Sequence, residues 1–311
     1  MVQKYENKKN TRDQILKLRK KENEKKKNKT SIYDLAMYKN LMKPKKNNEK
    51  NFILNKNQEI LDQIIEADSR DLSKYIRDNT VSLIITSPPY NVGKEYDQNF
   101  TLNNYLEYLD LVWRECYRIL RVGGRICINV TGLGRKPYIP IPALITTHLL
   151  DLNFYMRGEI IWDKGASVGS STAWGSWKSP TNPTIRDVHE HILIFSKESN
   201  QLKKNGNTPD ITRDEFLSYT KSIWSFPTTN ARVIGHPAPF PEELPSRLIK
   251  LYSFPGDLIV DPFMGSGTTC LAAKVLSRHW LGFDIEPEYV KLAKLRINKV
   301  EKDYLIQKTI L

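Results

Sequence analysis

The chain has 311 residues, 40% of them hydrophobic, so it can bury a core as one large α/β domain or as two ordinary domains. It contains no run of about 18 uncharged apolar residues, which a membrane-spanning helix would need, and its first residues are too charged for a secretory signal. The formal net charge is +13, and residues 1–50 alone carry 17 Lys and Arg against 6 Asp and Glu.

Residues 1–50 are rich in lysine and poor in apolar side chains, which predicts a flexible or partly helical basic arm before a folded domain at 51–311. Such an arm can bind nucleic-acid phosphates by releasing counterions, or it can be a solubilising tail. Composition does not decide between the two. The cysteines Cys116, Cys127 and Cys270 form no CxxC pair and lie in apolar contexts, which favours buried free thiols and a cytoplasmic location.

After a short strand that ends near Asp68, the β-branched, apolar sequence VSLIIT at 81–86 is typical of a buried parallel strand. The strand runs directly into Ser87, two prolines and an aromatic residue. Two consecutive prolines fix φ near about −65° and lack N–H groups, while their carbonyls remain acceptors. This stiff array suits a flat ligand that carries an amine. A proline-rich exit loop is the alternative.

Strands and helices alternate along the rest of the chain. Apolar residues at helical spacing predict helices at 102–120 and 141–154, and the glycines of RVGGR suit a C-cap and turn after the first. β-branched runs predict strands at 126–130, 159–164 and 188–197, whereas 165–183 and 198–221 are loop-like. The last third predicts helices at 242–253, 268–277 and 287–300 and strands at 257–261 and 279–284. This alternation predicts a doubly wound α/β fold with a mostly parallel sheet.

The sequence IVDPFMGSGTTCLAA at 259–273 predicts a strand, a glycine turn and the start of a helix. Gly265 and Gly267 allow a ligand to approach the backbone, and Thr268 or Thr269 can cap the helix. No lysine follows Gly267, so the turn is not a phosphate-binding P-loop, and Cys270 replaces the third glycine of the dinucleotide fingerprint. A tight turn with a capped helix and no ligand is the alternative.

Acidic residues stand at the ends of two predicted strands in this region. Asp261 directly precedes the glycine turn and suits a ligand with a cationic or amine group. About 20 residues further on, Asp284 ends the next strand, where such an acid can hydrogen-bond ribose hydroxyls.

Four segments together resemble the S-adenosylmethionine-dependent DNA amino-methyltransferases. TSPPY at 86–90 is similar to their (D/N/S)PP(Y/F) catalytic motif, and DPFMGSGTT at 261–269 to their FxGxG cofactor motif. The order of these two motifs is that of the β group. HPAPFPEELPSRLI at 236–249 resembles the cofactor-flanking helix motif, and HEHILIFSK at 189–197 a strand of the catalytic half.

This resemblance implies a seven-stranded Rossmann-like methyltransferase sheet with permuted motif order and insertions for target recognition. It implies S-adenosyl-L-methionine as cofactor, double-stranded DNA as substrate, a restriction endonuclease as a functional partner, and no metal. The implied cofactor-binding residues are Asp68 near the adenine, Asp284 at the ribose, and Asp261, Phe263, Gly265, Gly267 and Thr268 in the cofactor loop.

The resemblance also implies the catalytic roles of Ser87, Pro88, Pro89 and Tyr90. An exocyclic base amine is a poor nucleophile, because its lone pair is delocalised into the ring. Hydrogen bonds from the amine to the Ser87 hydroxyl and the Pro88 carbonyl would localise that lone pair, and the prolines would hold the acceptors rigid. Tyr90 would stack on the flipped base. The chain has no Pro-Cys nucleophile motif, which disfavours methylation at cytosine C5.

Serine before the prolines and the HPAPFP form of the flanking motif are typical of members that methylate cytosine N4. Adenine N6 is the alternative, and an RNA methyltransferase or a non-enzymatic nucleic-acid-binding protein are further rivals. Target-recognition insertions are expected at about 163–186 and 198–231. Their candidate DNA contacts are Lys164, Lys178, Arg186, Arg213 and Arg232, each of which can equally face solvent.

Overall fold

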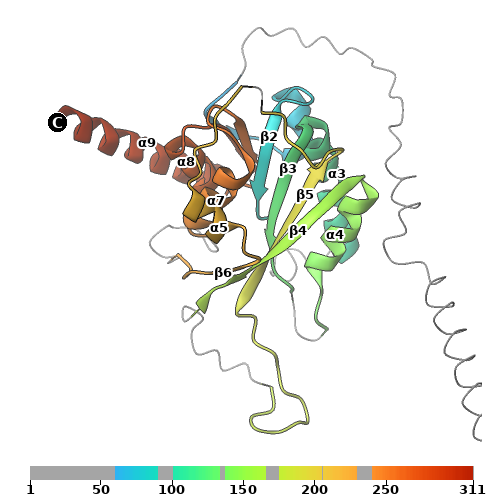
Figure 1. Ribbon diagram of the computed structural model, residues 1–311. Coiled ribbons are helices and arrows are strands. Elements are labelled where there is room, and N and C mark those ends of the chain that lie inside the picture. The colour runs from blue at the N-terminus through green and yellow to red at the C-terminus, as the bar shows by residue number, and fades with distance from the viewer. Residues whose placement is uncertain are drawn as a thin grey trace, which may run out of the picture. The chain divides into compact units, whose positions relative to one another are not determined.

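The computed structural model describes residues 60–89, 101–133, 137–165, 175–204, 206–229 and 240–310. The predicted basic arm and Tyr90 of the catalytic motif lie outside these ranges. The strands form one sheet in the order β1-β8-β7-β2-β3-β5-β4-β6 (Figure 1). They are β1 (Gln63–Glu66), β2 (Val81–Thr86), β3 (Leu120–Val130), β4 (Phe154–Asp163), β5 (His189–Lys197), β6 (Ile223–Ser225), β7 (Leu258–Asp261) and β8 (His279–Asp284).

The sheet is mostly parallel, as predicted. Among the described strands, only β5 runs against its neighbours, being antiparallel to both β3 and β4, and every other neighbouring pair is parallel. The described sheet has eight strands, so the expectation of seven was wrong. The strand β6 is not predicted by the sequence, because its three residues are too few to show an alternating pattern, but they pair with the end of β4.

Helices cover both faces of this sheet, which makes the fold doubly wound. The helices are η1 (Ser69–Lys74), α3 (Leu102–Ile119), α4 (Ile141–Asp151), α5 (Arg213–Tyr219), α7 (Glu243–Tyr252), α8 (Thr268–Val275) and α9 (Pro287–Ile310). Side chains from η1, α3 and α4 share one buried core with the sheet, on what we call the α3 face. Side chains from α7, α8 and α9 form the other core, on the α7 face. Figure 1 shows α3 and α4 on the opposite side of the sheet from α7 and α8.

Two sequence expectations differ from the structure around the predicted loops. The glycines of RVGGR do not cap α3, because the helix ends at Ile119 and β3 begins at once with Leu120. Gly123 has φ +77° near an irregularity in the β2–β3 register, and a Cβ there would lie 2.0 Å from the carbonyl oxygen of Gln201. The segment predicted as a loop at 198–221 contains α5, which begins with a capping box.

The three cysteines are buried free thiols, as predicted. In the described part of the chain, no helix is long and apolar enough to cross a membrane.

The chain changes direction across the sheet between β7 and β2. From β2 it crosses through α3, on one face, to β3, whereas from β7 it crosses through α8, on the other face, to β8. The neighbouring strands β7 and β2 therefore send their connections to opposite sides. In open α/β sheets, ligands bind outside the carboxyl ends of the strands at such a switch point.

Candidate active site

The carboxyl ends of four neighbouring parallel strands bring the predicted motifs together at this switch point. Thr86, the last residue of β2, donates a hydrogen bond from its hydroxyl to Oδ1 of Asp261, the last residue of β7, at 2.8 Å. The hydroxyl of Ser69, next to Asp68, donates to the carbonyl of Pro262. Segments that are distant in sequence thus meet at one edge of the sheet. No sequence pattern indicates these roles of Thr86 and Ser69.

Asp261 is 1% exposed, so its carboxylate lies inside the protein. Besides the Thr86 hydroxyl, Oδ1 accepts the backbone N–H of Phe263 at 3.1 Å. Burial raises the pKa of Asp261 to about 6, against the lowering effect of these hydrogen bonds. The carboxylate therefore joins the catalytic strand to the turn that follows β7.

The glycine turn needs backbone conformations that favour glycine. Gly265 has φ +50° and Gly267 has φ +78°. A Cβ on Gly267 would lie 2.8 Å from the Cβ of Ala293 in α9, so close packing also requires glycine there.

The predicted threonine cap of α8 was wrong, because Gly267 is the N-cap and no side chain in the described ranges caps this helix. Arg296 of α9 instead donates to the carbonyl of Ser266 at 2.6 Å and to the hydroxyl of Thr268 at 3.1 Å. Thr268 is buried. These contacts show that a helix from the end of the chain holds the turn, a feature that no local sequence pattern signals.

Asp284 ends β8 beside this turn. Its Oδ2 accepts the N–H of Gly265 at 2.9 Å, and its Oδ1 accepts the N–H of Glu286 at 3.0 Å. Burial raises the pKa of Asp284, and backbone hydrogen bonds from Glu286, Gly265 and Ile285 oppose that shift. Because a carboxylate offers about four lone-pair positions, acceptor capacity remains on Asp284 for a ribose hydroxyl.

An aromatic wall adjoins the turn. The ring of Phe263 lies 6.2 Å from that of Tyr108 and 6.3 Å, edge to face, from that of Trp113. The guanidinium of Arg70 lies 5.3 Å from the centre of the Tyr108 ring and also binds both carboxylate oxygens of Asp68. This ion pair lowers the pKa of Asp68. The predicted adenine acid therefore lies next to an aromatic surface of a kind that suits a purine.

The catalytic segment leaves the sheet beside these groups. Ser87 is half-buried, Pro88 is buried and Pro89 is exposed. The pairing of β2 with β7 and the hydrogen bond from Thr86 to Asp261 together fix where Ser87 lies relative to the glycine turn.

Residues 81–295 match the model of the N6/N4 DNA methylases. The chain belongs to this family. The methylase is 33% identical to the Type II methyltransferase M.HpaI of Haemophilus parainfluenzae over 238 residues, which cover 72% of this chain and 70% of that protein. It is 31% identical to the Type II methyltransferase M.ScaI of Streptomyces caespitosus over 258 residues, which cover 75% of this chain and 80% of the relative.

A solved structure, that of the Thermus thermophilus protein TTHA0409 complexed with S-adenosyl-L-methionine, is similar to the methylase in fold and sequence. The two have a TM-score of 0.62 and 29% identity, and the match covers 76% of this chain and 93% of that one. The methylase is thus a DNA methyltransferase that uses S-adenosyl-L-methionine. The remaining acceptor capacity of Asp284 fits the ribose of this cofactor, and the aromatic wall fits its adenine.

The basic residues predicted to contact DNA lie in different surroundings. Lys164 forms an ion pair with Glu190 at 2.5 Å, and Lys178 lies 5.6 Å from the centre of the Trp177 ring. Arg213 is exposed at the start of α5, and Arg232 lies outside the described residues. Arg186 is half-buried.

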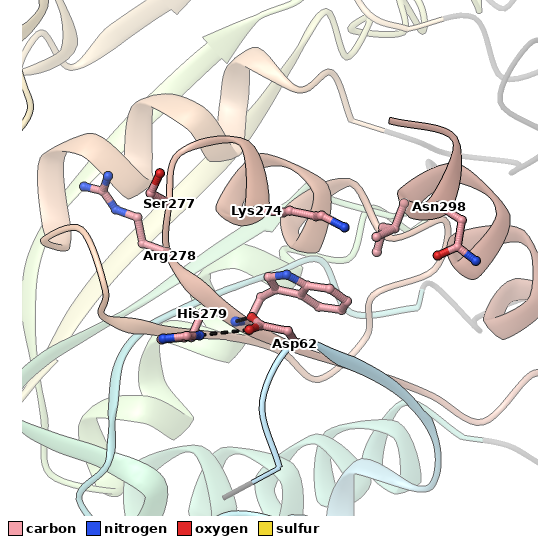
Figure 2. Close-up of a pocket in the computed structure, with 8 residues that line it drawn as sticks. Asp62, Lys274, Ser277, Arg278, His279 and Asn298 are labelled. Atoms are coloured by element: carbon pink, nitrogen blue, oxygen red, sulfur yellow. Dashed lines mark hydrogen bonds and ion pairs between the residues drawn. The ribbon is translucent and has the colours of Figure 1, made fainter. Parts of the chain in front are cut away.

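A pocket of about 490 Å³ lies at the opposite edge of the sheet, at the amino ends of β1 and β8 (Figure 2). His279 Nδ1 lies 2.9 Å from Asp62 Oδ2 there, and Lys274 and Asn298 also line the pocket. Because Asp261 and Asp284 stand at the carboxyl ends of their strands, this pocket is separate from the catalytic edge.

Proposed function

We propose that the methylase transfers the methyl group of S-adenosyl-L-methionine to the N4 amine of cytosine in duplex DNA, within a restriction–modification system. The observation that carries this proposal is the hydrogen bond between Thr86 and Asp261, since it joins the proline motif to the cofactor turn at the switch point of the sheet. The order of the motifs supports DNA as the substrate, and Ser87 before the prolines and the HPAPFP sequence support cytosine as the base. The Type II names of the two relatives support the restriction–modification context.

In this proposal each end of the cofactor has its own group of residues. Asp284 accepts the ribose hydroxyls, and Asp68 accepts the adenine amine beside Phe263. The turn containing Gly265 and Gly267 holds the methionine part. Asp261 and Thr268, which are buried, act by fixing this turn.

The cofactor supplies an electrophilic methyl group on a positively charged sulfur. The chain supplies acceptors for the base amine, namely the Ser87 hydroxyl and the Pro88 carbonyl, which localise the nitrogen lone pair. Both acceptors are held before the base arrives, because proline restricts the backbone and Thr86 is anchored to Asp261. Tyr90 stacks on the flipped base.

DNA binding combines two kinds of contact in this proposal. The basic arm at 1–50 contacts phosphates, which carry no sequence information. The segments 163–186 and 198–231 supply contacts that distinguish the target.

Transfer of tritium from labelled S-adenosyl-L-methionine tests the substrate class. We expect label in duplex DNA from a methylation-deficient host and none in RNA. Sequencing of the DNA of an expressing host at nucleotide resolution then tests the base, and we expect N4-methylcytosine at one short motif. Methylated adenine at that motif would move the proposal to N6, whereas label in RNA alone would refute it.

A further inference from the structure

Asn129 is a buried polar residue on the strand next to the catalytic motif. The β2–β3 register pairs Ile85 with Cys127 and Thr86 with Ile128, which places Asn129 level with Ser87. Ile85 and Cys127 both belong to the core of the α7 face. Because side chains alternate along extended strands, Asn129 and Ser87 follow on that face, and paired strands lie only about 4.8 Å apart.

Asn129 is held by a carboxylate on the far side. Its Nδ2 donates to Oε2 of Glu190 on β5, and the other carboxylate oxygen of Glu190 lies 2.5 Å from Nζ of Lys164. Glu190 and Lys164 are both largely buried, with side chains 17% and 19% exposed. Glu190 is therefore bound on both oxygens, by a charged donor on one side and an amide on the other.

This arrangement fixes which way the amide of Asn129 points. An ionised carboxylate only accepts hydrogen bonds, so Asn129 must present its NH₂ group to Glu190 and turn its oxygen away. Asn129 is 3% exposed, and its Oδ1 is buried and has no hydrogen-bond partner among the described residues. An unsatisfied buried acceptor is costly, which points to a donor that arrives with a ligand.

We propose that Oδ1 of Asn129 shares with the Ser87 hydroxyl one of the two protons of the exocyclic amine of the target base, while the Pro88 carbonyl accepts the other, and that Glu190 and Lys164 are positioning residues that fix the orientation of the Asn129 amide. This inference rests on the proposed function. The chemistry recognised is a hydrogen-bond donor at the reacting position. The fixed orientation of the Asn129 amide thus favours a base with an amine at the reacting position. A base with a carbonyl oxygen at that position would face the oxygen of Asn129 with no proton between the two oxygens.

The direction of the hydrogen bond between residues 129 and 190 can be reversed by exchanging the amide and the carboxylate between these two positions. In Glu190→Gln, the oxygen of the new amide stays with Lys164, its NH₂ faces Asn129, and Asn129 turns its own oxygen toward that NH₂. In Asn129→Asp, two carboxylates face each other. In the double variant N129D/E190Q, the glutamine amide on β5 donates to the aspartate carboxylate on β3, whose second oxygen again faces the catalytic edge.

Turnover of tritium-labelled S-adenosyl-L-methionine on DNA from a methylation-deficient host measures the effect. We expect each single substitution to lower kcat about ten- to a hundredfold, with cofactor affinity by calorimetry changed less than about twofold. We expect the double variant to recover kcat to within about fivefold of the wild type. Recovery of this kind cannot come from a residue that only fills space.

A double variant no more active than Asn129→Asp would overturn the inference, as would a single Glu190→Gln variant with unchanged kcat. The wild-type protein in the same assay distinguishes a failure of this inference from a failure of the proposed function. If the wild type labels DNA but the double variant does not recover kcat, the roles inferred for Asn129 and Glu190 are wrong and the proposed function stands. If the wild type labels no DNA, the proposed function fails first.

Discussion

Asp261 shows how one buried carboxylate can join two sequence motifs. Its Oδ1 accepts from the Thr86 hydroxyl and from the N–H of Phe263, so the catalytic strand and the cofactor turn share one acceptor. From its place before the glycine turn, this acid is expected to face a ligand with a cationic or amine group. Its position at a strand end could be predicted, but whether its side chain faces a ligand or the interior depends on how β2 and β7 pair.

A pH dependence of stability follows from that burial. Because the pKa of Asp261 is about 6 in the folded protein and about 3.9 in an unfolded chain, the folded state holds the proton more tightly. Its contribution to the free energy of unfolding is fully present below about pH 4 and is lost as pH rises to about 6, a change of about 3 kcal/mol.

Asp261→Asn removes this titration. Urea unfolding at pH 4 and pH 7 should therefore show the variant gaining about 3 kcal/mol relative to the wild type between the two. Parallel pH profiles for the two proteins would contradict the assigned burial of the charge.

In our proposal, Ser87 stabilises the transition state of methyl transfer. Its hydroxyl accepts from the base amine as that amine becomes pyramidal, so Ser87→Ala should lower kcat and leave cofactor affinity nearly unchanged. One such hydrogen bond is worth about 1–3 kcal/mol, or one to two powers of ten in rate. Single-turnover kinetics and calorimetric titration with S-adenosyl-L-methionine measure the two effects. An equal loss in both would place Ser87 in the cofactor site.

The segment that follows β5 packs against α7, the helix that precedes the strand of the glycine turn. Arg247 of α7 lies 4.9 Å from the centres of the Tyr219 and Phe226 rings and 5.2 Å from that of Trp224. Lys250 of α7 pairs with Glu215 of α5. Part of the segment predicted for target recognition therefore packs against the helix that flanks the cofactor turn.

The ion pair between Arg278 and Asp210 should contribute most to this attachment. The Arg278 side chain is 0% exposed, and its Nη2 donates to Asp210 Oδ1 at 2.7 Å and to the Ser253 carbonyl at 2.9 Å. Asp210→Ala leaves a buried cation without its carboxylate, which should lower the free energy of unfolding by about 3 kcal/mol.

Glu215→Gln is the matched control for Asp210→Ala. It removes the charge that pairs with Lys250, but glutamine can keep the capping box with Thr212. Since the Lys250 pair is partly exposed, its loss should cost less than about 1 kcal/mol in a urea-unfolding measurement. Equal decreases in the free energy of unfolding of the two variants would show that the buried Arg278–Asp210 pair stabilises the fold no more than the partly exposed Lys250–Glu215 pair.

Long elements were predictable from the sequence because their patterns are strong. The β-branched run of β2 and the apolar stripe of α3 give clear periodicity, and both form where predicted. Short elements such as β6 and α5 have too few residues for a period to show, and tertiary pairing decides them. Motif residues at strand ends were predictable for the same reason as the strands. Asn129 and Arg296 were not, because their roles arise from neighbours on distant parts of the chain.

For the whole molecule, charge is distributed very unevenly along the sequence. Residues 1–50 carry a net +11 of the total +13. Removing them should weaken DNA binding and flatten its dependence on salt, because fewer counterions are released. Target preference should stay the same, since phosphate contacts carry no sequence information. Fluorescence anisotropy of labelled duplex DNA across a salt series tests this, and an unchanged slope would make the segment a tail without a role in DNA binding.

In our proposal, the methylase transfers a methyl group to an exocyclic amine of a DNA base. The most direct measurement incubates the protein with S-adenosyl-L-methionine carrying a trideuterated methyl group and with unmethylated duplex DNA, then digests the DNA for mass spectrometry of the nucleosides. We expect trideuterated N4-methylcytosine, whose yield should fall about ten- to a hundredfold with the Ser87→Ala protein. Label on carbon 5 of cytosine, or no labelled nucleoside from an enzyme that binds the cofactor, would contradict this proposal.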